Sequence, residues 1–139
     1  MPPRDLKRLA PSAYTVAIIC PLEVEMSAAR FMLEEHHRPS TAQGDKSIYI
    51  AGEVQGHNVV IASLPMNYKG TAPVATVASY MEHTFPSITL RLLVGIGGGV
   101  PSEEADVRIG DVVVSSPKDT YGGVVQHVLS YIEPPPPTF

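Results

Sequence analysis

The sequence is poor in several residue types, and each scarcity excludes a class of protein. Its 139 residues include 1 cysteine and no tryptophan. A lone cysteine cannot form a disulfide within the chain, which excludes a disulfide-stapled secreted scaffold. A membrane-spanning helix needs about 20 consecutive apolar residues, and no such run is present. The apolar run Val16–Cys20 is also too short for a signal sequence. We therefore predict a cytoplasmic globular chain that contacts no membrane.

Positive charge is also scarce. The chain has 10 lysines and arginines against 14 aspartates and glutamates, which gives a net charge of −4. No basic stripe with interleaved aromatic residues is present, so we predict no binding to nucleic acid. A hydrophobic content of 44% and a charged content of 17% are ordinary for a globular domain.

The common nucleotide and hydrolase motifs are missing. A dinucleotide-binding G-x-G-x-x-G motif that began at Gly95 would need a third glycine where Val100 stands, and an acidic stretch follows. The phosphate-binding G-x-x-x-x-G-K-[ST] motif and the G-x-S-x-G elbow of serine hydrolases are both absent. The five histidines show no metal-ligand spacing, and we expect them to be solvated or hydrogen-bonded. We predict no metal and no cofactor, and a nucleotide-dependent oxidoreductase is disfavoured.

The most informative segment that is present is the apolar run Leu92–Val100, which contains three consecutive glycines, Gly97–Gly99. Glycine lets the backbone approach a ligand closely. In open α/β sheets, ligands bind beyond the carboxyl ends of the strands. The run therefore predicts a small-molecule site with a wall of bare backbone. A tight turn, which needs only one or two glycines, is the alternative.

The order of apolar segments predicts an α/β fold with a mixed, largely parallel twisted sheet flanked by helices. We expect a flexible lead-in at residues 1–13, one domain at residues 14–126 and a proline-rich tail at residues 127–139. Four consecutive prolines in that tail cannot join a helix or a sheet interior, and we expect the fold to be incomplete. The expected strands are Tyr14–Cys20, Ser47–Val54, Asn58–Leu64, Arg91–Ile96 and Asp111–Ser116, and the expected helices are Leu22–Glu35 and Ala72–Phe85.

One carboxylate falls on the apolar side of the first predicted helix. At about 100° per residue, Glu25 lies within the arc of Met26 and Ala29, whereas Glu23 lies on its flank. A buried carboxylate is costly unless it is paired or used, and burial favours general-base chemistry. For Glu25 we favour a functional role, and for Glu23 a first-turn carboxylate that the helix dipole stabilises. For Cys20 we favour a small core residue over a reactive thiol.

Six segments in fixed order resemble the nucleoside phosphorylase/nucleosidase superfamily. The likeness is greatest to methylthioadenosine/S-adenosylhomocysteine nucleosidase-like domains of fungal proteins, and it spans Tyr14 to Gln126. The segments are Ile18–Met26, the hairpin up to Ala62, the helix Ala72–Phe85, Val94–Val100, Ile109–Ser115 and Gly122–Gln126.

The resemblance implies a phosphorylase/hydrolase-like fold, no cofactor, and cleavage of the N-glycosidic bond of a purine nucleoside. Glu25 matches the water-activating glutamate of the nucleosidases. Gly97 and Gly98 match the backbone against base and ribose, and Ile96 stands where many nucleosidases have serine. The Gly-Asp-Pro-x-Arg phosphate motif of the phosphorylases is absent, and no arginine follows the first strand until Arg30. Water is thus favoured over phosphate as co-substrate. Complete family members form homodimers.

In this family, a ribose-binding Met-Glu pair and the aspartate that protonates purine N7 come from the later half. No residue of this sequence matches them, since 13 residues follow Gln126. We therefore expect an N-terminal part of such a domain that is inactive alone. The alternative is a non-catalytic nucleoside-sensing or signalling module of a larger fungal protein, so whether the chain belongs to an enzyme stays open.

Overall fold

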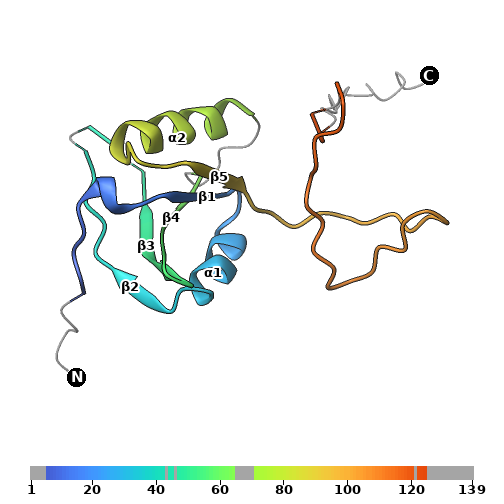
Figure 1. Ribbon diagram of the computed structural model, residues 1–139, viewed down its shortest axis with the longest axis horizontal. Helices are drawn as coiled ribbons and strands as arrows, with labels where there is room; N and C mark the ends of the chain where they lie inside the picture. Colours follow the sequence, from blue (N-terminus) through green and yellow to red (C-terminus); the bar gives the residue numbers. More distant parts are fainter. Residues whose placement is uncertain (1–5, 43, 46, 65–70, 121, 125–139) are drawn as a thin grey trace, which may run out of the picture. The chain divides into compact units, whose positions relative to one another are not determined.

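A computed structural model describes residues 6–42, 44–45, 47–64, 71–120 and 122–124. The chain divides into two units, Met1–Gly97 and Gly98–Phe139. All helices and strands that the structure describes belong to the first unit (Figure 1). The predicted proline-rich tail at residues 127–139 lies outside the described residues.

The described part of the first unit contains a five-stranded mixed sheet in the order β2-β3-β4-β1-β5. Strand β1 pairs in parallel with β4 and β5, whereas β3 is antiparallel to both β2 and β4. The mixed α/β class is thus confirmed, but only half of these pairings are parallel, fewer than expected. The strands are β1 (Val16–Cys20), β2 (Glu35–His37), β3 (Tyr49–Val54), β4 (His57–Ser63) and β5 (Leu90–Leu93).

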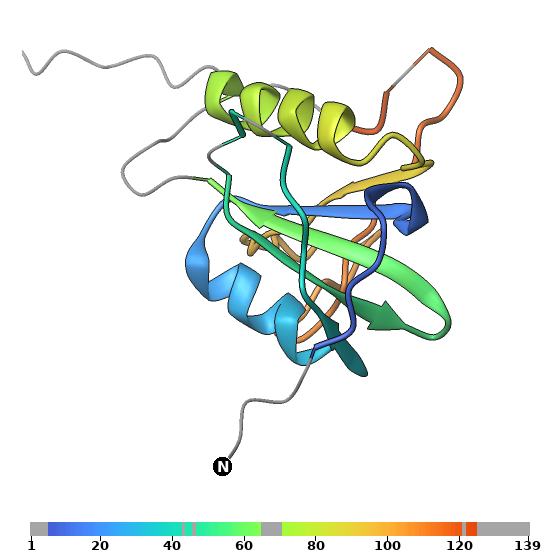
Figure 2. The same cartoon turned by 90° about the vertical axis from the view of Figure 1, so that its left-hand side faces the viewer.

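Helices α1 (Glu23–Phe31) and α2 (Thr71–Thr84) cover opposite faces of the sheet (Figures 1 and 2). Strand β4 is buried on both faces, and its alternate residues serve two separate hydrophobic clusters. Val60 and Ala62 pack with the α2 side, and Val59 and Ile61 pack with the α1 side. This period of two follows from the strand geometry, in which successive side chains point to opposite faces.

The predicted hairpin is confirmed, with β3 and β4 joined at Gln55 and Gly56. Both turn residues have positive φ, 49° and 78°. Such a pair is typical of the two-residue turns whose twist matches that of the flanking strands. The sequence predicted a connection of three residues, 55–57, whereas His57 belongs to β4, and both strands differ by one or two residues from the predicted limits.

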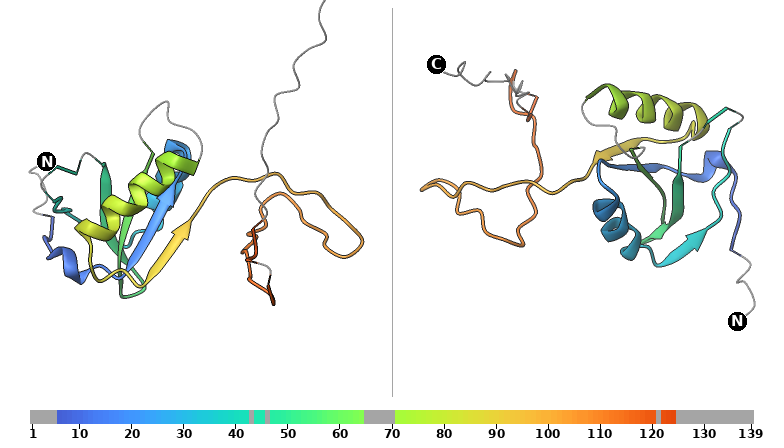
Figure 3. Two further views of the ribbon diagram at one scale, coloured as in Figure 1. Left: turned by 90° about the horizontal axis from the view of Figure 1, so that it is seen from above. Right: turned by 180° about the vertical axis from the view of Figure 1, so that it is seen from behind.

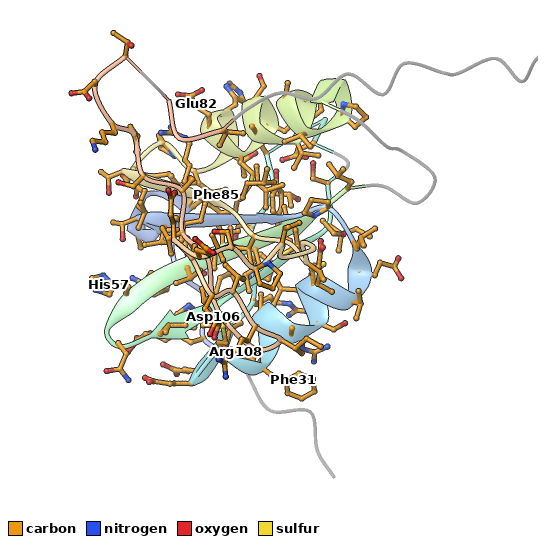
Figure 4. All side chains as sticks on the ribbon, turned by 90° about the vertical axis from the view of Figure 1, so that its right-hand side faces the viewer. Phe31, His57, Glu82, Phe85, Asp106 and Arg108 are labelled. Atoms are coloured by element: carbon orange, nitrogen blue, oxygen red, sulfur yellow. The ribbon has the colours of Figure 1, made fainter. Side chains whose placement is uncertain are left out.

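The first helix is shorter than predicted. It ends at Phe31, which is 90% exposed and whose ring points away from the protein (Figure 4). The chain then turns back, and the Glu34 N–H donates to the carbonyl of Glu53 at 2.9 Å, just before β2 pairs with β3. Pairing with a distant strand thus overrides the helical pattern, because local propensity is a weak constraint.

Part of the predicted lead-in contacts the sheet. Pro11–Ala13 forms a short 3-10 helix, and Lys7 forms a parallel bridge with His37 of β2. The Arg38 N–H also donates to the carbonyl of Lys7 at 2.8 Å. Lys7 therefore pairs with residues at the edge strand β2, so this part of the predicted lead-in is attached to the sheet.

The second unit has no helix or strand in its described residues, 98–120 and 122–124 (Figure 3). The prediction of a strand at Asp111–Ser116 was wrong. Val112, Val113 and Val114 are 88%, 75% and 80% exposed. A run of valines indicates that a strand would fit, but a strand forms only where a neighbouring strand accepts its hydrogen bonds.

Within the described residues, no helix combines the length and the apolar character needed to cross a membrane.

Candidate functional site

Glu25 is buried, as the helical pattern predicted, with 6% of its surface exposed. It occupies the third position of α1, and its Oε2 accepts a hydrogen bond from the Leu22 N–H at 2.7 Å. Leu22 is the residue before the helix, and its N–H would otherwise lack a partner within the helix. This contact is half of a capping box, because leucine has no oxygen with which to return the bond. Glu23 is exposed, in agreement with its predicted solvent-facing position.

The second oxygen of Glu25 joins α1 to the segment after β5. Its Oε1 accepts a hydrogen bond from the Ile96 N–H at 2.8 Å. Just before this contact, the Val94 N–H donates to the Ile19 carbonyl at 2.9 Å, which continues the parallel pairing of β5 with β1. The carboxylate thus lies at the carboxyl ends of two adjacent parallel strands, the edge at which open α/β sheets bind ligands.

Gly95 makes room for this carboxylate. A Cβ atom at position 95 would lie 3.1 Å from Glu25 Oε1, closer than side chains normally approach. Gly95 does not have positive φ, and neither does any residue of Gly97–Gly99. The alternative of a turn that needs glycine-only backbone is therefore not supported. The glycine-rich run predicted a close approach of the backbone, but sequence reasoning did not single out Gly95.

The predicted binding residues occupy the segment beyond Gly95. The structure brings the Ile96 backbone to Glu25, while 76% of the Ile96 surface is exposed. A Cβ atom at Gly97 would meet nothing within 4 Å. Gly98 is the first residue of the second unit. Ligand binding by Ile96, Gly97 and Gly98 stays a prediction.

The apolar arc predicted for Met26 and Ala29 is confirmed, because both residues are buried on α1. Leu22 and Met32, at the two ends of the helix, are 51% and 64% exposed. Both exposed residues lie just outside the helix, where its geometry no longer directs their side chains toward the sheet. Leu33 is buried, although it too follows the end of the helix.

Cys20 is a core residue, as predicted. It is fully buried at the end of β1. Burial, and then the nearby carboxylate of Glu25, raise the pKa of the Cys20 thiol to about 11. A thiol that stays protonated at neutral pH is a poor nucleophile. Activation by the helix N-terminus therefore does not occur here.

A polar network that sequence reasoning missed centres on Asp45. Its carboxylate accepts hydrogen bonds from the hydroxyls of Tyr49 at 2.7 Å and Thr84 at 2.8 Å, and from the Ser47 N–H at 2.9 Å. Burial alone raises the pKa of Asp45, but these hydrogen bonds outweigh burial and lower it. Burial and the bond to Asp45 raise the pKa of Tyr49. The network connects the start of β3 to the end of α2. The sequence pattern Asp-x-Ser, which is typical of turns, was the one sign that Asp45 bonds to nearby backbone.

One buried histidine, His37, meets the expectation of a hydrogen-bonded side chain through one ring nitrogen only within the described part of the chain. His37 is 3% exposed, and its ring packs edge-on against Tyr14. Its Nδ1 lies 3.4 Å from the Tyr14 hydroxyl, but its Nε2 is buried without a hydrogen-bond partner among the described residues.

The chain is similar to a protein from Hyaloscypha variabilis described as a nucleotide-binding leucine-rich repeat (NLR)-like protein. The two are 45% identical over 121 residues, which make up 86% of this chain and 12% of that protein. The chain thus spans a small part of the relative that it matches. No family model matches the chain. No solved structure matches it either.

Proposed function

We propose that this chain provides the Glu25-bearing part of a domain that cleaves the N-glycosidic bond of a purine nucleoside, with a phosphorylase/hydrolase-like fold. The observation that carries the proposal is the buried carboxylate of Glu25, held by backbone N–H groups at the carboxyl ends of β1 and β5. The order of the sequence segments supports the same family.

In this proposal, Glu25 activates water. Each carboxylate oxygen accepts one backbone hydrogen bond, so each keeps a lone pair for a water molecule. The water oxygen bonds to the anomeric carbon of ribose while Glu25 takes its proton. The bond from that carbon to the purine nitrogen breaks, and its electron pair leaves with the base. The base then needs a proton from an acid that this sequence does not supply.

The segment after Gly95 supplies the contact surface for the nucleoside. Gly97 presents backbone without a side chain, and the exposed Ile96 side chain offers apolar contact where a serine would offer a hydrogen bond. Gly98 follows Gly97 in the sequence, and its contact with the nucleoside is part of the proposal. The hydrogen bond from the Ile96 N–H to Glu25 places this segment beside the proposed general base.

A second candidate is a nucleoside-sensing module of a signalling protein. The observation that favours it is the description of the Hyaloscypha variabilis relative as NLR-like, together with the 12% of that protein that the chain spans. In this case the same surface binds a nucleoside and no bond is cleaved.

Nucleoside binding tests what the two candidates share. Methylthioadenosine or adenosine is titrated into the chain, and backbone amide resonances are followed by NMR. We expect dose-dependent shifts at Ile96 and Gly97 that Gly97→Val abolishes and Glu23→Gln leaves intact. If neither nucleoside shifts these resonances at millimolar concentration, Ile96 and Gly97 do not form a nucleoside-binding surface, and the binding role that both candidates give to this segment is wrong.

Adenine release separates cleavage from sensing. Chromatography measures release by the long Hyaloscypha variabilis relative and by its variant at the position aligned with Glu25. A rate of adenine release that is about 10²-fold or more lower in the variant supports cleavage, since general-base catalysis typically contributes that much. Nucleoside binding without release favours the sensing module. We expect the 139-residue chain itself to release no adenine above buffer.

A further inference from the structure

Strand pairing brings three metal-ligand side chains together, away from Glu25. In the antiparallel register of β2 and β3, Glu35 lies directly opposite Glu53. His37 follows Glu35 by two residues and therefore shares its face of the sheet. One ligand atom from each of these residues lies within 4.8 Å of the other two. Like charges directly opposite each other destabilise a sheet unless something compensates them.

His37 gives an independent indication that a ligand is bound here. Its side chain is fully buried, and Nε2 has no hydrogen-bond partner among the described residues. This nitrogen lies 3.7 Å from Glu35 Oε2. An unpaired nitrogen in the protein interior is costly, so native structures rarely leave one without a role.

The other ring nitrogen already has the partner that a metal-bound histidine usually has. Such histidines donate their second N–H to a neighbouring oxygen, which orients the ring toward the metal. Here Nδ1 faces the Tyr14 hydroxyl at 3.4 Å, and the two rings pack edge to face. Tyr14 is itself fully buried, so this orientation is firmly held.

We propose that His37 Nε2 and one carboxylate oxygen each from Glu35 and Glu53 bind a divalent transition metal, with Zn²⁺ the best match. An imidazole combined with carboxylates suits Zn²⁺ better than Mg²⁺ or Ca²⁺, which take oxygen ligands alone. With bonds near 2.05 Å, ligand atoms of a tetrahedral site lie about 3.3 Å apart. The 3.7 Å between His37 and Glu35 therefore needs only a small adjustment. Water completes the coordination.

A surface hollow lies beside part of the cluster. Its volume is about 590 Å³, and Lys7, Glu35 and His37 are among its lining residues, whereas His37 Nε2 itself is buried. Glu35 is exposed and Glu53 is half-buried, so both carboxylates have room to turn toward an ion.

Lys7 offers a competing explanation of the cluster. Its Nζ lies 3.7 Å from Glu35 Oε2, and both side chains are about half exposed. Exposed pairs of this kind contribute little to stability. The ammonium group also leaves the buried Nε2 of His37 without a hydrogen-bond partner among the described residues. If the metal binds, it displaces Lys7 from Glu35, so Lys7→Met should strengthen metal binding.

The test is titration of the metal-free 139-residue chain with Zn²⁺, by calorimetry and by competition with a chromogenic chelator. We expect one ion per chain with micromolar affinity or better. We expect Glu35→Gln and Glu53→Gln each to weaken binding about tenfold or more, and Lys7→Met to strengthen it. His36→Gln is the matched control, because His36 is the neighbouring histidine on the opposite face.

His37→Gln should abolish binding, provided that circular dichroism shows it to be folded. If it does not fold, the two glutamate variants decide the question, because both side chains are at least partly exposed. X-ray absorption of the zinc complex should show only nitrogen and oxygen ligands near 2.0–2.2 Å. The proposal is wrong if Zn²⁺ does not bind at about 100 μM, equivalent to a binding free energy weaker than about −5.5 kcal/mol. It is also wrong if Glu35→Gln and Glu53→Gln leave the affinity unchanged, or if His36→Gln weakens binding equally.

Discussion

Replacing Glu25 with glutamine keeps the shape of the side chain but removes its charge and one acceptor oxygen. In the structure, both carboxylate oxygens accept backbone hydrogen bonds, from Leu22 at 2.7 Å and Ile96 at 2.8 Å. An amide can satisfy only one of these donors. Its NH₂ group must face the other N–H, which then has no acceptor.

The size of the expected loss in unfolding free energy follows from these two hydrogen bonds. A hydrogen bond to a charged group contributes about 1.5–3 kcal/mol, and a buried donor left unpaired costs about 1–3 kcal/mol. One of the two bonds is lost and the other becomes a weaker neutral bond. We therefore expect Glu25→Gln to lower the free energy of unfolding by about 2–4 kcal/mol.

The assay is equilibrium urea denaturation followed by far-ultraviolet circular dichroism. The slope of the unfolding free energy against urea should stay the same, because the folded surface is unchanged. Glu23→Gln is the matched control, because Glu23 is exposed on the same first turn. Its effect should stay within about 0.5 kcal/mol, as for most surface substitutions.

Equal midpoints for Glu25→Gln and Glu23→Gln would refute this reasoning. They would mean that the two backbone bonds do not hold Glu25 in solution, and the link from α1 to the segment after β5 would lose its support. The proposal for water activation would lose its general base as well.

Three further predictions concern other positions. Gly95→Ala should destabilise the first unit, because the new methyl group would displace the Glu25 carboxylate, whereas Gly97→Ala should not. The urea midpoints of the two variants test this prediction, and equal midpoints would contradict it. The lowered pKa of Asp45 adds stability that is present above the ordinary aspartate pKa of about 3.9 and is lost as the pH falls through the lower folded value. The stability difference between wild type and Asp45→Asn should therefore shrink on acidification, and a constant difference in pH-dependent melts would argue against the network. Cys20 should react with iodoacetamide at pH 8 about a hundredfold more slowly in the native chain than in urea, because it is buried with a raised pKa; mass spectrometry measures both rates, and similar rates would show that the thiol is accessible.

Some of this protein could be predicted from local sequence patterns. The first strand, the hairpin and α2 were predicted with ends within a few residues, and Gln55-Gly56 marked the turn. The burial of Glu25 followed from its place in the helical pattern. In each case the signal lies within about one turn or one hairpin, so the residues that carry it are also those that form the structure.

Strand pairing was decided only by the tertiary structure. Residues 35–37 have a helix-like neighbourhood, yet they form β2 because β3 offers its free edge. Asp111–Ser116 has a strand-like composition, yet it forms no strand in the described residues. A strand depends on hydrogen bonds to a remote partner, and no local pattern encodes whether that partner is in reach.

The dependence on strand pairing also explains why the burial of Glu25 could be predicted from the sequence and the cluster of Glu35, His37 and Glu53 could not. The sequence by itself determined that Glu25 would lie on the buried side of its helix, whereas the close approach of Gly95 to this carboxylate came from the folded structure. Only the folded sheet placed Glu35 opposite Glu53 and the Nε2 of His37 beside them. Register sets which side chains meet across two strands, and a shift of one residue would have sent them to opposite faces.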